Sequence, residues 1–274
     1  MENRKKRRFI MTVLLLGMTV CLIPVVGAGY QSRRHRIQQE ELQARQREDG
    51  EQKDQKRIEA LPAVTEAEDN EGKNAEESTE PVILDQYAAL YEDNRDLTGW
   101  LSIAGTVIDY PVMQCDSDEY YLEHDFYRDA SSYGCLFVKD IADVNTPGTN
   151  FIIYGHNMRD GSMFGDLDQY QTKSFFQEHP LISFDTLYEK RTYEVIAVFP
   201  SQVYYEDEDV FKYYQFYQAD TQEEFNYFYK NIKVLSLYDT GVEAEFGDTF
   251  LTLSTCAYHV EDGRFVVVAK RASE

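Results

Sequence analysis

Three residues suited to nucleophilic catalysis stand at the ends of predicted strands. Cys256 ends the apolar segment 249–256, His156 follows the apolar segment 150–154, and Arg264 opens the last predicted strand. A thiolate attacks carbonyl carbon, an imidazole transfers protons near neutral pH, and a guanidinium donates hydrogen bonds to a developing oxyanion. Although a strand-end cysteine by itself is more often a buried structural residue, the three types together predict acyl transfer through a cysteine.

The spacing of Cys256 and Arg264 predicts that they are neighbours in space. A short connection containing Asp262 and Gly263 joins the two strands that carry them. In an antiparallel pair, the end of the first strand lies beside the start of the second. We therefore expect both side chains at one mouth of the fold, with His156 arriving from another strand end.

Eight short segments that are rich in Val, Ile, Phe, Tyr and Thr and are bounded by turn residues predict strands. They are 100–103, 106–112, 134–138, 150–154, 181–184, 192–199, 249–255 and 264–270. A barrel or a sandwich fits this pattern. Apolar residues at helical spacing predict helices near 84–91, at 162–169 and at 221–234, the last started by Asp220 or Thr221.

The N-terminal third predicts a surface-anchored protein. Residues 1–8 are basic and form the expected cytoplasmic segment, and residues 9–30 are uncharged, mostly apolar and long enough for a transmembrane signal anchor. A cleaved signal peptide is the alternative, because small residues at 26–28 offer a cleavage site. Residues 31–82 predict a charged flexible stalk, helical over 37–61, and residues 83–274 the catalytic domain.

The charge distribution argues against a nucleic-acid partner. Residues 61–274 carry 14 Lys and Arg against 41 Asp and Glu, within a chain of net charge −22. Binding to phosphate backbones depends on Lys and Arg. We therefore expect no nucleic acid among the partners.

The four cysteines lack the paired spacing of a zinc ribbon or a disulfide scaffold. Cys21 lies in the apolar run, and Cys115 and Cys135 either pair or are buried singly; we favour single burial. Cys256 and His259 form a C-x-x-H half-site, but no second pair lies at zinc spacing. No metal and no cofactor are expected.

Three separated motifs resemble the signature segments of class B sortases. They are TLSTC at 252–256, YGHN at 154–157 and RFVVVAKR at 264–271. The resemblance extends back through 94–114 and covers essentially all of 84–271. A helix ahead of the TLSTC strand is also more typical of class B than of class A.

This resemblance implies a mainly β fold, a closed eight-stranded barrel with peripheral helices, on the surface of a Gram-positive cell. Similar enzymes cleave a C-terminal sorting motif between Thr and Gly. On that model Cys256 forms the thioacyl intermediate, His156 protonates the leaving amine, and Arg264 supports the oxyanion or orients the substrate. Ser254, Thr255 and Asn157 are the expected substrate contacts.

The implied partners are surface proteins bearing a sorting signal, an acceptor amine of a peptidoglycan precursor or a pilin, and the membrane. Two other functions stay open: a thiol hydrolase that releases the thioester to water, and a non-catalytic surface module. The tyrosines at 204, 205, 213, 214 and 217 either line a peptide groove or fill a flank of the barrel.

Overall fold

The computed structural model describes residues 27, 29–50, 81–117, 119–257, 260 and 262–273. It divides into two compact units between Leu42 and Gln43. Residues 29–50 are helical, which agrees with the described part of the helix predicted for 37–61. Within the described residues, no helix has both the length and the apolar character needed to cross a bilayer. The predicted anchor lies almost entirely outside these residues, and so do Cys21 and His259.

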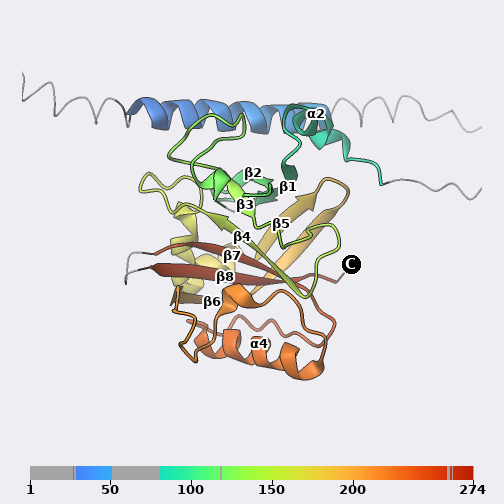
Figure 1. Cartoon of the computed structure of the whole chain (residues 1–274), viewed down its shortest axis with the longest axis vertical. Coiled ribbons are helices and arrows are strands. Elements are labelled where there is room, and N and C mark those ends of the chain that lie inside the picture. Colours follow the sequence, from blue (N-terminus) through green and yellow to red (C-terminus); the bar gives the residue numbers. More distant parts are fainter. Residues whose placement is uncertain are drawn as a thin grey trace, which may run out of the picture. The chain divides into compact units, whose positions relative to one another are not determined.

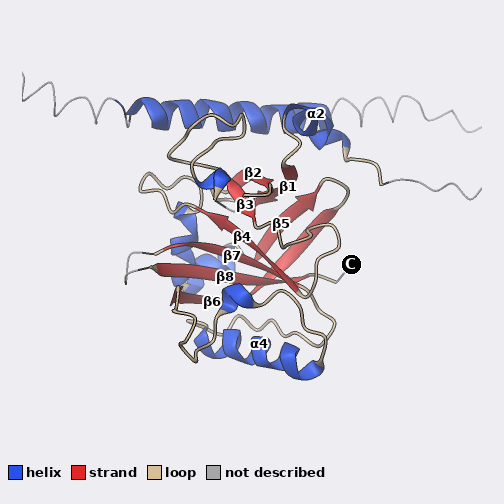
Figure 2. Cartoon of the chain, viewed as in Figure 1, coloured by secondary structure: helices blue, strands red, loops and turns tan. Residues whose placement is uncertain are grey.

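The second unit contains eight strands that close into a barrel, which confirms the predicted architecture (Figure 2). The order around the barrel is β1-β2-β3-β4-β7-β8-β6-β5. The strands are β1 (Leu97–Ser102), β2 (Asp109–Met113), β3 (Leu136–Val138), β4 (Asn150–Gly155), β5 (Leu181–Thr186), β6 (Lys190–Gln202), β7 (Phe250–Cys256) and β8 (Gly263–Arg271).

The pairing of β7 with its two neighbours positions the candidate catalytic residues. β4 and β7 run parallel, and their last register pair is Gly155 with Thr255. β7 and β8 run antiparallel, and their pairing at this edge ends with Cys256 opposite Arg264. The carboxyl ends of β4 and β7 therefore meet the start of β8 at one edge of the barrel.

Two hydrophobic clusters bury β4, β7 and β8 on both faces. Inward side chains such as Phe151, Leu253 and Val267 fill the barrel. Outward side chains such as Phe250 and Val266 pack beneath a helix. Because both faces are covered, these strands are apolar almost throughout, as is typical of fully buried strands.

The covering helix is α4 (Gln222–Leu235), which packs against the barrel at β6 (Figure 1). It buries Phe225, Phe228 and Ile232, the apolar stripe seen in the sequence. Thr221 caps it: the Thr221 hydroxyl accepts from the Glu224 amide, and the Glu224 carboxylate accepts from the Thr221 amide. The predicted helix start is therefore confirmed as a capping box.

The remaining helices are short. They are α2 (Asp85–Asp93), η1 (Tyr120–Leu122), η2 (Gly165–Gln171), α3 (Lys173–Glu178) and η3 (Tyr213–Gln215). The helix predicted for 162–169 is instead a 3₁₀ helix that begins at Gly165. Buried Met163, which precedes it, has a φ of 55°, and a left-handed residue interrupts a helix. The strand predicted from residue 106 begins only at Asp109.

Candidate active site

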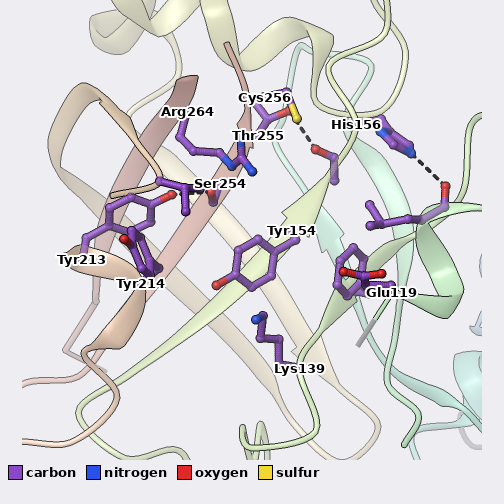
Figure 3. Close-up of a pocket in the computed structure, with 14 residues that line it drawn as sticks. Glu119, Lys139, Tyr154, His156, Tyr213, Tyr214, Ser254, Thr255, Cys256 and Arg264 are labelled. Carbon is purple, nitrogen blue, oxygen red and sulfur yellow. Dashed lines mark hydrogen bonds between the residues drawn. The ribbon is translucent and has the colours of Figure 1, made fainter. Parts of the chain in front are cut away.

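A cleft of about 460 Å³ opens at the edge where β4 and β7 end and β8 begins (Figure 3). Cys256, His156 and Arg264 all line it, so the fold brings the three residues to one cleft. Their chemical roles stay predictions. The complete lining is Glu119, Leu122, Phe137, Lys139, Tyr154, Gly155, His156, Val203, Tyr213, Tyr214, Ser254, Thr255, Cys256 and Arg264.

Cys256 is half-buried at the last position of β7. The amide of Ala257 donates to the carbonyl of Gly263 at 2.9 Å, which closes the β7–β8 connection directly behind it. Asp262 in this connection adopts a φ of 52°, a left-handed conformation that aspartate tolerates in turns. The thiol therefore stands at the rim of the barrel, where a bound peptide can reach it.

Arg264 is fixed by the same turn. Its Nη1 donates to the carbonyls of Gly263 at 2.9 Å and Asp262 at 3.2 Å. Figure 3 shows the guanidinium directed from β8 toward the end of β7. A permanently charged group is therefore held beside Cys256 with a defined orientation.

The orientation of His156 comes from a backbone carbonyl. Its Nε2 lies 2.8 Å from the carbonyl oxygen of Leu122, in η1. A carbonyl only accepts, so Nε2 carries a proton, and in the neutral ring Nδ1 is the unprotonated nitrogen. Figure 3 marks this hydrogen bond of the His156 ring with a dashed line. Nδ1 is therefore the nitrogen left for proton transfer.

Ser254 and Thr255 line the cleft as predicted, but each is engaged by the protein. The hydroxyls of Tyr213 and Ser254 lie 2.7 Å apart, and both residues are buried. Burial disfavours the phenolate and raises the pKa of Tyr213 to about 12. The Thr255 hydroxyl donates to the carbonyl of Gly155 at 2.7 Å, which ties β7 to β4.

Asn157 is not among the residues that line the cleft, and its predicted substrate contact stays a prediction. Its Nδ2 donates to the carboxylate of Asp168 at 2.8 Å and to the carbonyl of Cys256 at 3.1 Å. The sequence placed Asn157 beside His156 but contained no sign of these partners. Its amide thus bonds both to a carboxylate of η2 and to the main chain of the proposed nucleophile.

Several lining residues were missed by sequence reasoning. Glu119, Leu122 and Val203 come from loops and a 3₁₀ turn with no motif of their own. Lys139, just after β3, lies 5.7 Å above the ring of Tyr154. Of the tyrosine cluster, Tyr213 and Tyr214 line the cleft and also belong to or pack against the outer hydrophobic cluster of the barrel, whereas Tyr205 is exposed.

The other described cysteines are both unpaired. Cys135 is buried, as expected, and burial raises the pKa of its thiol. Cys115 is only half-buried, and its thiol donates to the carbonyl of Ser117. Neither of them lines the cleft.

A closed barrel whose rim presents a cysteine, a histidine and an arginine to one cleft defines a class of cysteine acyl-transfer enzymes. The sortase domain model matches residues 101–272. Sortase B of Listeria monocytogenes is 36% identical over 195 residues, which cover 69% of this chain and 74% of that protein.

Solved structures agree with this match. Sortase B from Bacillus anthracis in complex with AAEK1 is 33% identical with a TM-score of 0.62, over 70% of this chain and 86% of that one. The Staphylococcus aureus sortase B–substrate complex is 29% identical with a TM-score of 0.63, over 70% and 87%. The chain belongs to the sortase family, class B, and is a sortase-type cysteine transpeptidase.

Proposed function

We propose that this transpeptidase acts at the cell surface, cleaves a C-terminal sorting motif between Thr and Gly, and joins the protein to an amine of peptidoglycan or a pilin. One observation carries the proposal. Cys256 and Arg264 are direct cross-strand neighbours on a cleft that His156 also lines. The S. aureus relative has been solved as a substrate complex, which supports a sorting-signal substrate for this chain.

In the first half-reaction the thiolate of Cys256 attacks the carbonyl carbon of the threonine. The carbonyl electrons move to oxygen, and Arg264 stabilises the oxyanion with charge-assisted hydrogen bonds. The carbon–nitrogen bond then breaks, and Nδ1 of protonated His156 gives its proton to the leaving amine. A thioester on Cys256 remains.

In the second half-reaction the acceptor amine attacks the thioester carbonyl. His156, now neutral, takes a proton from this amine at Nδ1, and Arg264 again stabilises the oxyanion. The carbon–sulfur bond breaks, and the thiolate of Cys256 leaves. The enzyme returns to its starting state with a new amide bond in the product.

The location is proposed from the sequence. A basic segment followed by the apolar run 9–30 supports an anchor with the catalytic domain outside, and the charged segment 31–82 supports a stalk between them. Fractionation of cells that express the full chain tests this. Recovery in the membrane is expected, and release into the medium would instead indicate a cleaved signal peptide.

Cleavage of a fluorogenic sorting peptide tests the reaction. We expect Cys256→Ala to lower turnover at least about 100-fold, the usual scale for loss of a covalent nucleophile. Cys115→Ala is the matched control, because this half-buried thiol lies off the cleft, and it should retain activity. Retained turnover in Cys256→Ala would refute the assignment.

Mass spectrometry of the products separates the transpeptidase from a hydrolase. With an amine acceptor present, a ligated peptide is expected from the wild-type enzyme. A product that is hydrolysed to the same extent with and without the amine would favour the thiol hydrolase.

A further inference from the structure

The side chain of Asn157 connects the two strand ends that carry the proposed nucleophile and acid–base residue. It directly follows His156 in the chain, and its Nδ2 lies 3.1 Å from the carbonyl oxygen of Cys256 and 2.8 Å from Oδ2 of Asp168. A carbonyl and a carboxylate only accept hydrogen bonds. Both partners therefore require the amide nitrogen at this point, so the orientation of the Asn157 amide is fixed by its surroundings.

The hydrogen bond from Asn157 to Cys256 links β4 to β7 just beyond the last backbone pair of these two strands. The parallel register of β4 and β7 ends at Gly155 opposite Thr255. Beyond it the β4 chain turns back on itself, since the amide of Phe164 donates to the carbonyl of His156 at 2.9 Å. The Asn157 side chain supplies the next link to β7, at the residue that carries the thiol.

Asp168 is a firm support for this link. It lies in η2 between Leu167 and Tyr170, both fully buried. Its carboxylate, held on this packed element, accepts a charge-assisted hydrogen bond from Asn157. This bond limits the freedom of the Asn157 amide. The position of the Cys256 carbonyl is thus tied to a packed part of the barrel flank.

We propose that Asn157 and Asp168 form a positioning pair, which sets the main chain of Cys256 relative to His156. Neither residue of the pair is among those that line the cleft. The inference rests on the proposed roles of Cys256 and His156. A misplacement of about 1 Å between reacting groups costs on the order of 100-fold in rate, so the pair acts on turnover and not on substrate affinity.

Steady-state kinetics with the fluorogenic peptide test the pair. Asn157→Ala removes the donor, and we expect kcat to fall about 30- to 100-fold while KM stays within about threefold. Asp168→Asn leaves an oxygen that accepts from Asn157 and keeps the bond to Cys256. Its kcat is expected within about fivefold of wild type, on the scale of one weakened hydrogen bond.

A swapped double variant separates positioning from stability. In Asn157→Asp with Asp168→Asn, the two side chains still bond to each other with donor and acceptor exchanged, but the Cys256 carbonyl has lost its donor. We expect Tm to recover relative to Asn157→Asp, in which two carboxylates face each other. We expect kcat to stay as low as in Asn157→Ala.

Asn150→Asp is the matched control. Asn150 is a buried asparagine at the opposite end of β4, and its Nδ2 donates to the carbonyl of Phe216 at 2.9 Å. It should lose Tm to an extent comparable with Asn157→Ala and keep kcat.

Three results would overturn the proposal: kcat of Asn157→Ala within threefold of wild type, full recovery of kcat in the swapped variant, or an equal loss of kcat in Asn150→Asp. Each leaves the proposed function intact if Cys256→Ala is inactive. Activity in Cys256→Ala would instead remove the function on which the pair depends.

Discussion

Substitution of Arg264 separates the charge of this residue from its geometry. The Nη1 atom already holds the carbonyls of Gly263 and Asp262, so the guanidinium is oriented before substrate arrives. A lysine carries the same charge on a single ammonium group. That group cannot hold the turn and also reach an oxyanion.

The expected losses follow from these contacts. Arg264→Gln removes both the charge and the donor fork, and loss of one oxyanion donor costs roughly 100- to 1,000-fold in kcat, about 2.7–4 kcal/mol. Arg264→Lys keeps the charge but loses a charge-assisted hydrogen bond worth about 1.5–3 kcal/mol. Its kcat should therefore fall roughly 10- to 150-fold.

The assay is peptide cleavage under saturating substrate, with alkylation of Cys256 by iodoacetamide as a check that the thiol stays accessible. Arg271→Gln is the control at the opposite end of β8. Arg271 pairs with Glu189 at 3.3 Å, and both side chains are about one-third or more exposed, so the pair is worth at most about 1 kcal/mol. Its kcat should stay within twofold of wild type.

Two outcomes would refute the reasoning. Arg264→Lys within threefold of wild type would mean that charge alone suffices and that the turn contacts are irrelevant to catalysis. Arg264→Gln within tenfold would remove Arg264 from oxyanion stabilisation altogether.

The remaining predictions concern stability. Burial raises the pKa of Tyr110, Tyr213 and Tyr238 to about 12, against about 10 in an unfolded chain. Between these two pH values the folded state binds the phenol protons more tightly than the unfolded state. The contribution of these tyrosines to the free energy of unfolding should therefore be complete below pH about 10 and fall as the pH rises toward 12. Urea midpoints from pH 8 to 11.5, followed with tyrosinate absorbance, check this, and a constant midpoint would contradict it. Thr221→Ala should lower the free energy of unfolding by about 1 kcal/mol and leave kcat unchanged. The control is Thr172→Ala, because Thr172 is the N-cap of α3 but makes no side-chain capping bond, and it should cost less. Equal losses of the two variants in chemical denaturation would argue against the capping box.

The local part of the fold could be read from the sequence because its causes are local. Side-chain type and periodicity predicted the strands, and the apolar stripe together with Thr221 predicted α4. The proximity of Cys256 and Arg264 also followed, since a short antiparallel connection brings its ends together. Closure of the barrel did not follow from periodicity, which fits a sandwich equally well, and was expected only from the family resemblance.

The arrival of His156 at the same edge has a non-local cause. It depends on the parallel pairing of β4 with β7, in which Phe151 lies opposite Leu251, 100 positions later in the sequence. Single-sequence patterns carry no record of which strands pair in parallel. The motif resemblance supplied this step, and the barrel order explains it.

The contacts at the site that the sequence did not predict are those in which a backbone group is the partner. Leu122 orients His156 through its backbone carbonyl. Because every residue has such a carbonyl, the residue type at position 122 could not have predicted this contact. The expected substrate contact of Asn157 came from the family resemblance, which carried no information on its protein partners; β4 stops pairing after Gly155, and the Asn157 side chain donates to the carbonyl of Cys256. The direction of a side chain just past a strand end depends on where its neighbour strand stops. At an active site built from strand ends, residue identity therefore predicts the reacting groups, and strand register determines which neighbouring residues hold them in place.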